Sequence, residues 1–225
     1  MCGRFTLTDP NAALAQLFEA APANDLPETP RFNICPTQPV AAVISDGGAR
    51  RLVPLRWGFL PQWYKSPTDG PLLNNARAES IAEKPAFRAA ARARRCLIPA
   101  SGFYEWTTGA EGERLPWYIH AAEGGTLAMA GIWQAWDGTG EREGERLVTC
   151  AVVTCAANDR LRALHDRMPV FVAPADRALW LGEAGHGAAR LMRPAPGELL
   201  AYHRVDRAVN SNRAAGPQLI APLPA

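Results

Sequence analysis

The middle of the chain carries a succession of short strand-like runs, and this succession most constrains the fold. Each run is rich in apolar, β-branched or aromatic residues, and Gly-rich or charged loops such as Thr107–Arg114 separate the runs. The runs do not alternate regularly with helices, which favours an α+β fold class over a parallel βαβ architecture. We expect five strands here, at Cys96–Ile98, Gly102–Trp106, Trp117–His120, Thr126–Trp136 and Leu147–Cys155.

Turn and capping patterns predict the remaining elements. Asp46-Gly47-Gly48 between two apolar runs predicts a hairpin over Val40–Leu55. Thr8-Asp9-Pro10 predicts a helix N-terminus, because apolar residues at helical spacing follow it. No internal repeat and no long linker interrupts residues 1–225, so we expect a single compact domain with a proline-rich tail from about residue 214. Other expected elements are helices over Ala86–Arg94 and Asn158–Leu164, a helix starting at Pro174, and a strand over Val170–Val172.

The composition narrows the class of protein. No apolar run approaches the ~18 residues of a membrane span, and the N-terminus lacks the layout of a signal peptide. We therefore expect a cytoplasmic protein that does not enter a membrane. The five cysteines include no C-x-x-C pair, so neither a metal site, a disulfide framework nor a cofactor is expected. The formal charge of +2 is too small to indicate nucleic-acid binding by itself.

The second residue, Cys2, offers unusual chemistry if Met1 is removed. Cys2 would then carry a free α-amine beside its thiol, and an α-amine titrates near ~7.7–8.0, well below a lysine. Nearby Arg4 is a cation of the kind that lowers a thiol pKa. A 1,2-aminothiol condenses with an aldehyde to an imine, and the thiol then closes a five-membered thiazolidine ring. The alternative is that Cys2 is simply a small apolar residue before a strand.

Polar residues also stand at positions where an apolar core would be expected. Asn75 and Arg77 follow an apolar run, Glu105 lies between two aromatic residues, and His165 follows an apolar stripe. Each has a structural alternative: Asn75 capping a turn, Glu105 facing solvent, or His165 paired with its neighbour. A cysteine with a histidine, a carboxylate and an amide is nevertheless a set that enzymes use.

Tryptophan is abundant for this length, with seven residues. Several must belong to the core. The stretch from Trp57 to Trp63, flanked by Arg56 and Lys65, is alternatively an exposed aromatic and basic platform on which nucleobases could stack.

Together, seven ordered stretches resemble the SOS-response-associated peptidase (SRAP) family, the abasic-site processing proteins. The resemblance runs from residue 1 to about residue 213, and seven blocks in order make chance a poor explanation. Cys35 stands where the family more often has a small apolar residue, a change of little consequence for size. The matching stretches are Met1–Phe5, Arg31–Thr37, Trp57–Trp63, Asn75–Glu79, Arg95–Trp106, Ala130–Trp133 and His165–Pro169.

The resemblance implies a fold and an activity. The fold would be a single α+β domain with a β-barrel-like core of mixed and antiparallel sheet, flanked by short helices. The activity would be covalent capture of abasic sites in single-stranded DNA through a thiazolidine on Cys2, by a monomeric protein that associates with the nucleoid when bound to DNA. A positively charged face would bind the strand.

Site roles carry over from the family onto matching positions. Asn75 would hold the Cys2 backbone and amine, while Glu105 and His165 would move protons during sugar opening, imine formation and reversal. The resemblance also implies phosphate contacts from Arg4, Arg77 and Arg167, and the tryptophan platform adds Trp57 and Trp63 to the expected DNA-binding residues.

Two other functions remain open from the sequence. In the first, Cys2 is an N-terminal nucleophile that cleaves peptide bonds, with its own amine as base. Asn75 would then donate to an oxyanion, and His165 would act as an acid. In the second, the protein reads damaged DNA without a covalent bond, and Cys2→Ser would bind DNA without loss.

Overall fold

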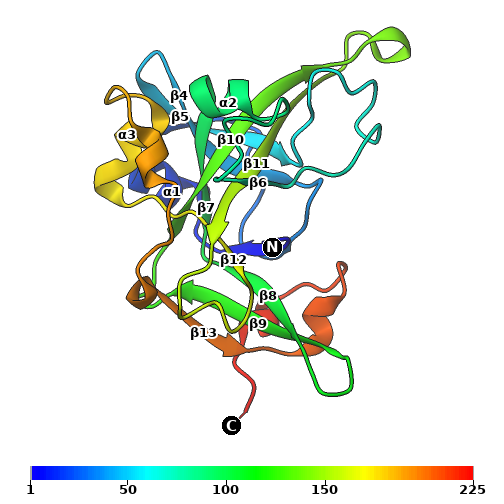
Figure 1. The fold of residues 1–225 in the computed structure, drawn as a ribbon, viewed down its shortest axis with the longest axis vertical. Helices are drawn as coiled ribbons and strands as arrows, with labels where there is room; N and C mark the ends of the chain where they lie inside the picture. The colour runs from blue at the N-terminus through cyan, green and yellow to red at the C-terminus, as the bar shows by residue number, and fades with distance from the viewer. Residues whose placement is uncertain (1, 225) are drawn as a thin grey trace.

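The larger sheet closes into a five-stranded barrel in the upper half of Figure 1. A computed structural model describes residues 2–224. Four antiparallel pairings join β11 to β10, β10 to β7, β7 to β4 and β4 to β5, and a parallel pairing of β5 with β11 closes the ring. Closure leaves these strands without free edges where they pair. The barrel strands are β4 (Pro39–Asp46), β5 (Ala49–Trp57), β7 (Arg95–Ala100), β10 (Leu127–Asp137) and β11 (Arg146–Ala156).

Three short strands extend the barrel sheet. β2 (Ala21–Pro22) adds to β5 in parallel, and β6 (Asn75–Arg77) adds to β11 in parallel. β12 (Arg167–Pro169) pairs with β11 antiparallel. One strand of the barrel, β11, therefore receives segments from two distant parts of the chain.

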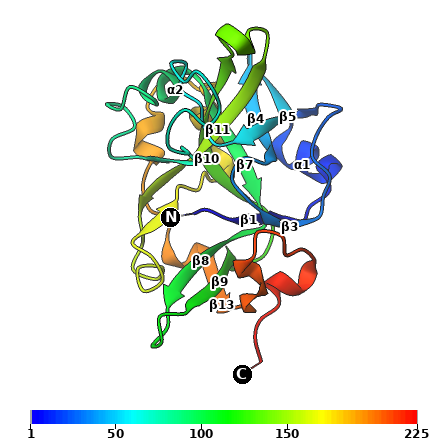
Figure 2. The same ribbon diagram turned by 90° about the vertical axis from the view of Figure 1, so that its right-hand side faces the viewer.

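A second sheet of five antiparallel strands lies below the barrel. Its order is β13-β9-β8-β1-β3. Figure 2 shows β1 crossing the middle of the molecule, between the barrel and the strands β8, β9 and β13. The first described residues of the chain therefore lie at the boundary between the two sheets. The strands are β1 (Phe5–Leu7), β3 (Arg31–Ile34), β8 (Gly102–Thr108), β9 (Arg114–Ala121) and β13 (Leu200–Arg204).

The helices are short and lie outside the sheets. They are α1 (Asn11–Phe18), α2 (Arg88–Ala93) and α3 (Arg177–Leu181). None of the helices in residues 2–224 is long and apolar enough to span a membrane. The α+β class with a barrel core and short flanking helices is confirmed. The described part of the chain also contains six 3-10 turns, at Gly140–Arg142, Pro174–Asp176, Ala188–Leu191, Gly197–Leu199, Arg207–Asn210 and Pro217–Ile220.

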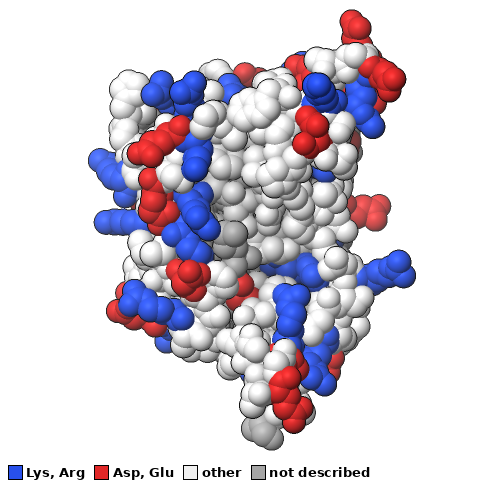
Figure 3. All heavy atoms as spheres, turned by 45° about the vertical axis from the view of Figure 1, so that its right-hand side comes forward, with Lys and Arg blue, Asp and Glu red and all other residues white. Residues whose placement is uncertain are grey.

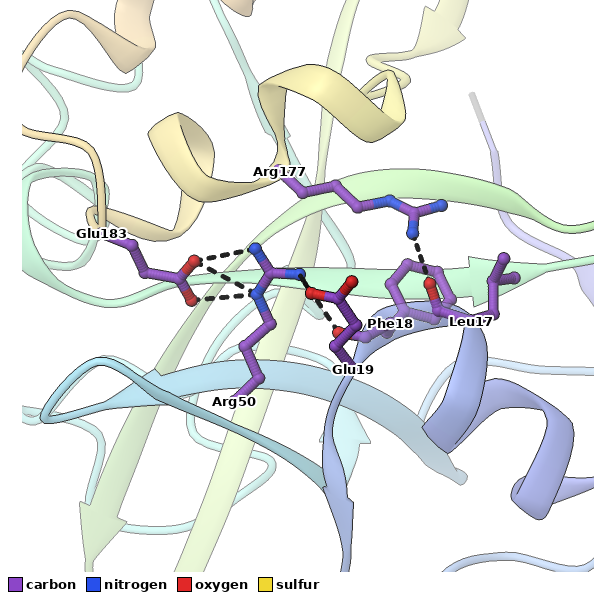
Figure 4. A network of polar contacts seen from close by, with 6 residues as sticks. All are labelled: Leu17, Phe18, Glu19, Arg50, Arg177 and Glu183. Carbon is purple, nitrogen blue, oxygen red and sulfur yellow. Dashed lines mark hydrogen bonds and ion pairs between the residues drawn. The ribbon is translucent and has the colours of Figure 1, made fainter.

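Two arginines fasten α1 and the α3 region to the barrel (Figure 4). Arg50 of β5 contacts both carboxylate oxygens of Glu183, the closer at 2.8 Å, and donates to the Phe18 carbonyl at 3.2 Å. Arg177 of α3 donates to the Leu17 carbonyl at 2.7 Å, and its guanidinium carbon lies 4.2 Å from the Phe18 ring centroid. These donors satisfy carbonyls at the C-terminal end of α1 that have no partner within the helix.

The local predictions hold where turn chemistry decides the backbone. Asp46 pairs with Ala49 across a two-residue turn, in which Gly47 and Gly48 adopt φ of 59° and 88°. The predicted hairpin is therefore confirmed. Glycine suits both central positions because each requires a positive φ.

Two local predictions are wrong. Residues 158–164 form turns rather than a helix, because the backbone bonds from Arg162 to Asn158 and from His165 to Leu161 are single turns that no continuous ladder joins. No strand spans Val170–Val172: β12 covers Arg167–Pro169, and Phe171 makes an isolated bridge to Met129. The start of α1 also differs from the expected cap: Pro10 is the N-cap, and the Asp9 carboxylate instead accepts from Thr126 at 2.9 Å.

Trp57 is not part of an exposed platform. It is fully buried, its ring lies 5.0 Å from the Phe5 ring edge-on, and its Nε1 donates to the Asn74 carbonyl at 2.9 Å. The prediction that Trp57 stacks on nucleobases is wrong, because no face of its ring reaches solvent. Trp63 differs, with 58% of the residue exposed.

The contrast between these tryptophans predicts their contributions to stability. Trp57→Ala should lower the free energy of unfolding by about 3–5 kcal/mol, because it leaves a cavity beside Phe5 and removes the donor to Asn74. Trp63→Ala should change it by no more than about 0.5 kcal/mol. Urea denaturation followed by circular dichroism measures both. Equal losses for the two variants would contradict the burial of Trp57.

Candidate active site at the N-terminus

Cys2 is buried directly ahead of β1, and β6 holds its backbone. The Cys2 carbonyl accepts the Asn75 Nδ2–H at 2.7 Å, and the Asn74 amide lies at 3.4 Å from the same oxygen. Parallel pairing with β11 aligns Asn75 beside Val152. The predicted contact between Asn75 and the Cys2 backbone is confirmed. The predicted contact of Asn75 with a free Cys2 amine remains a prediction. It requires the removal of Met1, which lies outside the described residues.

Glu105 and His165 lie around one cavity next to Cys2. Glu105 belongs to β8 and is 5% exposed, so the solvent-facing alternative is wrong. His165 lies in the turn before β12, with 27% of its side chain exposed. The cavity has a volume of about 330 Å³ and is lined by Gly3, Arg4, Glu105, Trp106, Thr107, Thr108, Arg114 and His165.

Burial dominates the protonation of the cysteine and the glutamate. It raises the pKa of the Cys2 thiol far above its usual range, and the negative charge of Glu105 raises it further. It also raises the pKa of the Glu105 carboxyl, an effect that the positive charge of His165 opposes. The thiol of Cys2 is therefore protonated at neutral pH, and this environment does not produce the reactive thiolate that a neighbouring cation would favour.

His165 is oriented by its immediate neighbours. The Arg167 backbone N–H lies 2.9 Å from Nδ1, and the Asp166 Oδ1 lies 2.9 Å from the same nitrogen. Nδ1 accepts from the amide in its unprotonated form and donates to the carboxylate in its protonated form, so these two neighbours orient the ring in either state.

Arg4 is a wall of the cavity rather than an exposed cation. It is 8% exposed, and its guanidinium donates to Asn33 Oδ1 and to the Val209 carbonyl, both at 2.8 Å, and to Asn212 Oδ1. Its guanidinium carbon also lies 5.5 Å from the Trp106 ring centroid. Arg4 therefore joins the N-terminal strand to β3 and to the C-terminal segment, and its predicted phosphate contact remains a prediction.

The two other predicted phosphate ligands differ from each other. Arg77 ends β6 with an exposed side chain. Arg167 makes a bidentate ion pair with Glu79 at 2.7 and 2.8 Å and also donates to the Thr154 carbonyl. The pair lowers the pKa of Glu79 to about 2, so the charge of Arg167 is compensated at neutral pH. Arg77 is thus the better placed of the two to meet a phosphate.

On the face drawn in Figure 3, the charged side chains lie around the edges of an uncharged region. Figure 3 shows a broad middle region without Lys, Arg, Asp or Glu, with Lys and Arg atoms along its sides and below it. Acidic atoms are interspersed among them. The predicted positive face is, in this view, a basic border around an uncharged surface.

Sequence reasoning missed four side chains that shape the site. Asn74 supplements Asn75 at the Cys2 carbonyl, and Asn33 and Asn212 bind Arg4. Arg114 lines the cavity although the sequence placed it at the end of a loop. The neighbouring motif stretches pointed to Asn33 and Asn74, whereas nothing local marks Arg114, because its position depends on the register of β9 against β8.

Comparison with known proteins identifies the family. The family model for SOS response associated peptidase (SRAP) matches residues 1–212. The chain is 34% identical to the abasic site processing protein YoqW of Bacillus subtilis, over 98% of this chain and 99% of that protein. It is 28% identical to YedK of Escherichia coli, also named an abasic site processing protein, over 99% and 100% of the two chains.

A solved structure agrees in fold. A crystal structure of a protein from Bacteroides thetaiotaomicron matches with a TM-score of 0.85 at 22% identity, covering 99% of this chain and 100% of that one. Because the family model spans nearly the whole chain and includes every residue of the site described above, this protein belongs to the SOS response associated peptidase family.

Proposed function

We propose that this protein captures abasic sites in single-stranded DNA by forming a thiazolidine between Cys2 and the ring-opened sugar. The observation that carries the proposal is that Glu105 and His165 line one cavity beside the buried Cys2, whose carbonyl is held by Asn75. The names of the relatives agree, since YoqW and YedK are abasic site processing proteins. The cavity volume of about 330 Å³ lies in the range of small-molecule sites, ~300–1,000 Å³.

The protonation of the site favours an order of steps. After removal of Met1, the α-amine of Cys2 attacks the C1′ aldehyde, and the resulting carbinolamine loses water to give an imine. The protonated thiol then adds across the imine: sulfur bonds to C1′ and its proton passes to nitrogen. The raised thiol pKa supports this order, because a neutral thiol is a poor first nucleophile.

Glu105 and His165 suit the proton transfers in this sequence. A buried carboxylate of raised pKa is a stronger base than an exposed one, and it can take the proton of the Cys2 ammonium. His165 can protonate the sugar ring oxygen as the hemiacetal opens. Specificity follows from the chemistry of the substrate, since a nucleotide that retains its base presents no free aldehyde at C1′.

The same protonation argues against cleavage of peptide bonds. A cysteine hydrolase needs a thiolate or a base that readily produces one, and burial together with the charge of Glu105 opposes thiolate formation at Cys2. The thiazolidine route uses the amine first and needs no thiolate. The family name alone therefore does not make peptide hydrolysis the better proposal.

The mature N-terminus should be essential for crosslinking. A variant with an uncleaved N-terminal extension has an amide at the Cys2 nitrogen, so the imine cannot form and no crosslink is expected. A site-specific protease that leaves Cys2 first should restore the reaction. Intact mass after incubation with an abasic oligonucleotide measures the product, which should equal the sum of both masses less one water. A crosslink formed by the uncleaved variant would show that another amine reacts.

Glu105→Gln should slow crosslinking by ~10²–10⁴-fold near neutral pH, because the base for the Cys2 ammonium is lost. Only the ionised carboxylate accepts a proton, and burial raises the Glu105 pKa, so the wild-type rate should rise with pH through a value above that of an ordinary glutamate. The defect should shrink at higher pH, where the amine deprotonates without help. Rates measured across pH on an abasic single strand test this. A variant that matches wild type at every pH would refute the role.

His165→Ala should slow both crosslink formation and its reversal, because each passes through opening or closing of the sugar ring. The two rates are measured separately, reversal by the return of the free protein mass after the purified crosslink is diluted. Binding of an undamaged single strand should be unchanged, which serves as the control for folding. Loss of formation alone, with normal reversal, would show that His165 acts at another step.

A further inference from the structure

The cavity beside Cys2 continues away from the reacting groups along the hairpin of β8 and β9. Its far end is formed by Thr107 and Thr108 of β8 and by Arg114, the first residue of β9. Thr108 and Arg114 are paired across the two strands. The cavity therefore links Glu105 and His165 at one end to an exposed arginine at the other.

Arg114 is held in position by an aromatic ring and by its own backbone. Its guanidinium carbon lies 4.7 Å from the Trp106 ring centroid, a cation–π geometry. The Trp106 Nε1 donates to the Asn210 Oδ1 at 2.7 Å, and the Asn210 amide donates to the Arg114 carbonyl at 3.1 Å. One asparagine thus fixes both the ring and the strand that carries the arginine. The exposed guanidinium is restrained before any ligand arrives, which lowers the entropy cost of binding.

The donors at this end suit an anion with several oxygens. Arginine and threonine side chains are among the groups that most often bind backbone phosphates in nucleic acids. The Thr107 hydroxyl already accepts the Trp117 Nε1–H at 2.9 Å, so its own proton is available for donation. Glu105 is the single acid among the described residues that line the cavity, and it lies next to the reacting groups rather than beside Arg114 in the hairpin.

We propose that Arg114 binds a backbone phosphate beside the abasic sugar and directs that flank of the single strand along the β8–β9 hairpin. This proposal rests on the proposed function, because it places the sugar at Cys2. Arg114 is a positioning residue: it contacts the DNA backbone and takes no part in the chemistry at C1′.

The chain contains a matched control for this arginine. Arg204 of β13 also lies over a tryptophan of the same sheet, with its guanidinium carbon 5.2 Å from the Trp117 ring centroid. It lines a different cavity, together with Asp206 and Arg207, and not the cavity of Glu105 and His165. Removal of either arginine deletes one charge and one cation–π contact. The two variants therefore differ in which cavity loses its arginine.

The test compares the salt dependence of DNA binding in the two variants. The probe is a single strand that carries a tetrahydrofuran abasic analogue, which has no C1′ hydroxyl and cannot form the aldehyde. Arg114→Ala should make the slope of log K against log salt less negative by about 0.7, the contribution of one phosphate contact on a single strand. Arg204→Ala should leave the slope unchanged, and Arg114→Lys, which keeps the charge, should retain the wild-type slope.

A neutral methylphosphonate introduced at each linkage in turn then locates the phosphate. Wild type should lose affinity at a linkage next to the analogue, and Arg114→Ala should be insensitive at that same linkage. With a true abasic strand, Arg114→Ala should raise the DNA concentration that gives half-maximal crosslinking, and Arg204→Ala should leave that concentration unchanged.

These measurements separate failure of this proposal from failure of the proposed function. Absence of any crosslink with wild type would overturn the function itself. Normal crosslinking with an unchanged salt slope for Arg114→Ala, or an equal change for Arg204→Ala, would overturn the role of Arg114.

Discussion

One edge of β11 organises the site, because it carries two parallel pairings in succession. Thr149 and Cys150 pair with the end of β5, which closes the barrel, and the next residues pair with β6. β6 in turn brings Asn75 to the Cys2 carbonyl. The edge of β11 that closes the barrel therefore also positions Asn75, which binds the Cys2 carbonyl. A shift of one residue in this register would turn Asn75 to the opposite face of its strand.

In the proposed reaction, a buried environment would select between two nucleophiles on Cys2, its thiol and its α-amine. Desolvation penalises the thiolate of Cys2, and it also favours the neutral form of an amine over the ammonium. Burial of Cys2 would therefore disfavour thiolate chemistry more than attack by an amine on an aldehyde. The same desolvation strengthens Glu105 as a base. Burial therefore acts on both groups in the direction that imine chemistry requires.

The sequence predicted what local chemistry and motif order decide. The Gly47-Gly48 turn needed only positive φ at two positions, and the order of the motif stretches indicated the family. The fate of Trp57 was not predictable in this way, because a tryptophan between an arginine and a glycine does not reveal which face of its strand is covered. Residues 158–164 misled for a related reason, since the Asn158 side chain caps the Leu161 N–H as at a helix start, yet only single turns follow it.

Contacts between distant segments account for the remaining misses. Arg167 looked like a free cation until the fold placed Glu79 against it in bidentate geometry. Arg114 looked like part of a loop until β9 paired with β8 from Thr108 onward. In each case the deciding partner lies on another element, so neither spacing nor composition carries the information.

Arg4 joins the two ends of the chain, and this has a consequence for biosynthesis. Its acceptors lie 29, 205 and 208 residues away in sequence, on Asn33, Val209 and Asn212. Two of the three do not exist in a nascent chain until synthesis has passed residues 209 and 212. Cys2 therefore leaves the ribosome well before the residues that hold Arg4 are made. The N-terminal strand cannot reach its final surroundings until those residues have been added.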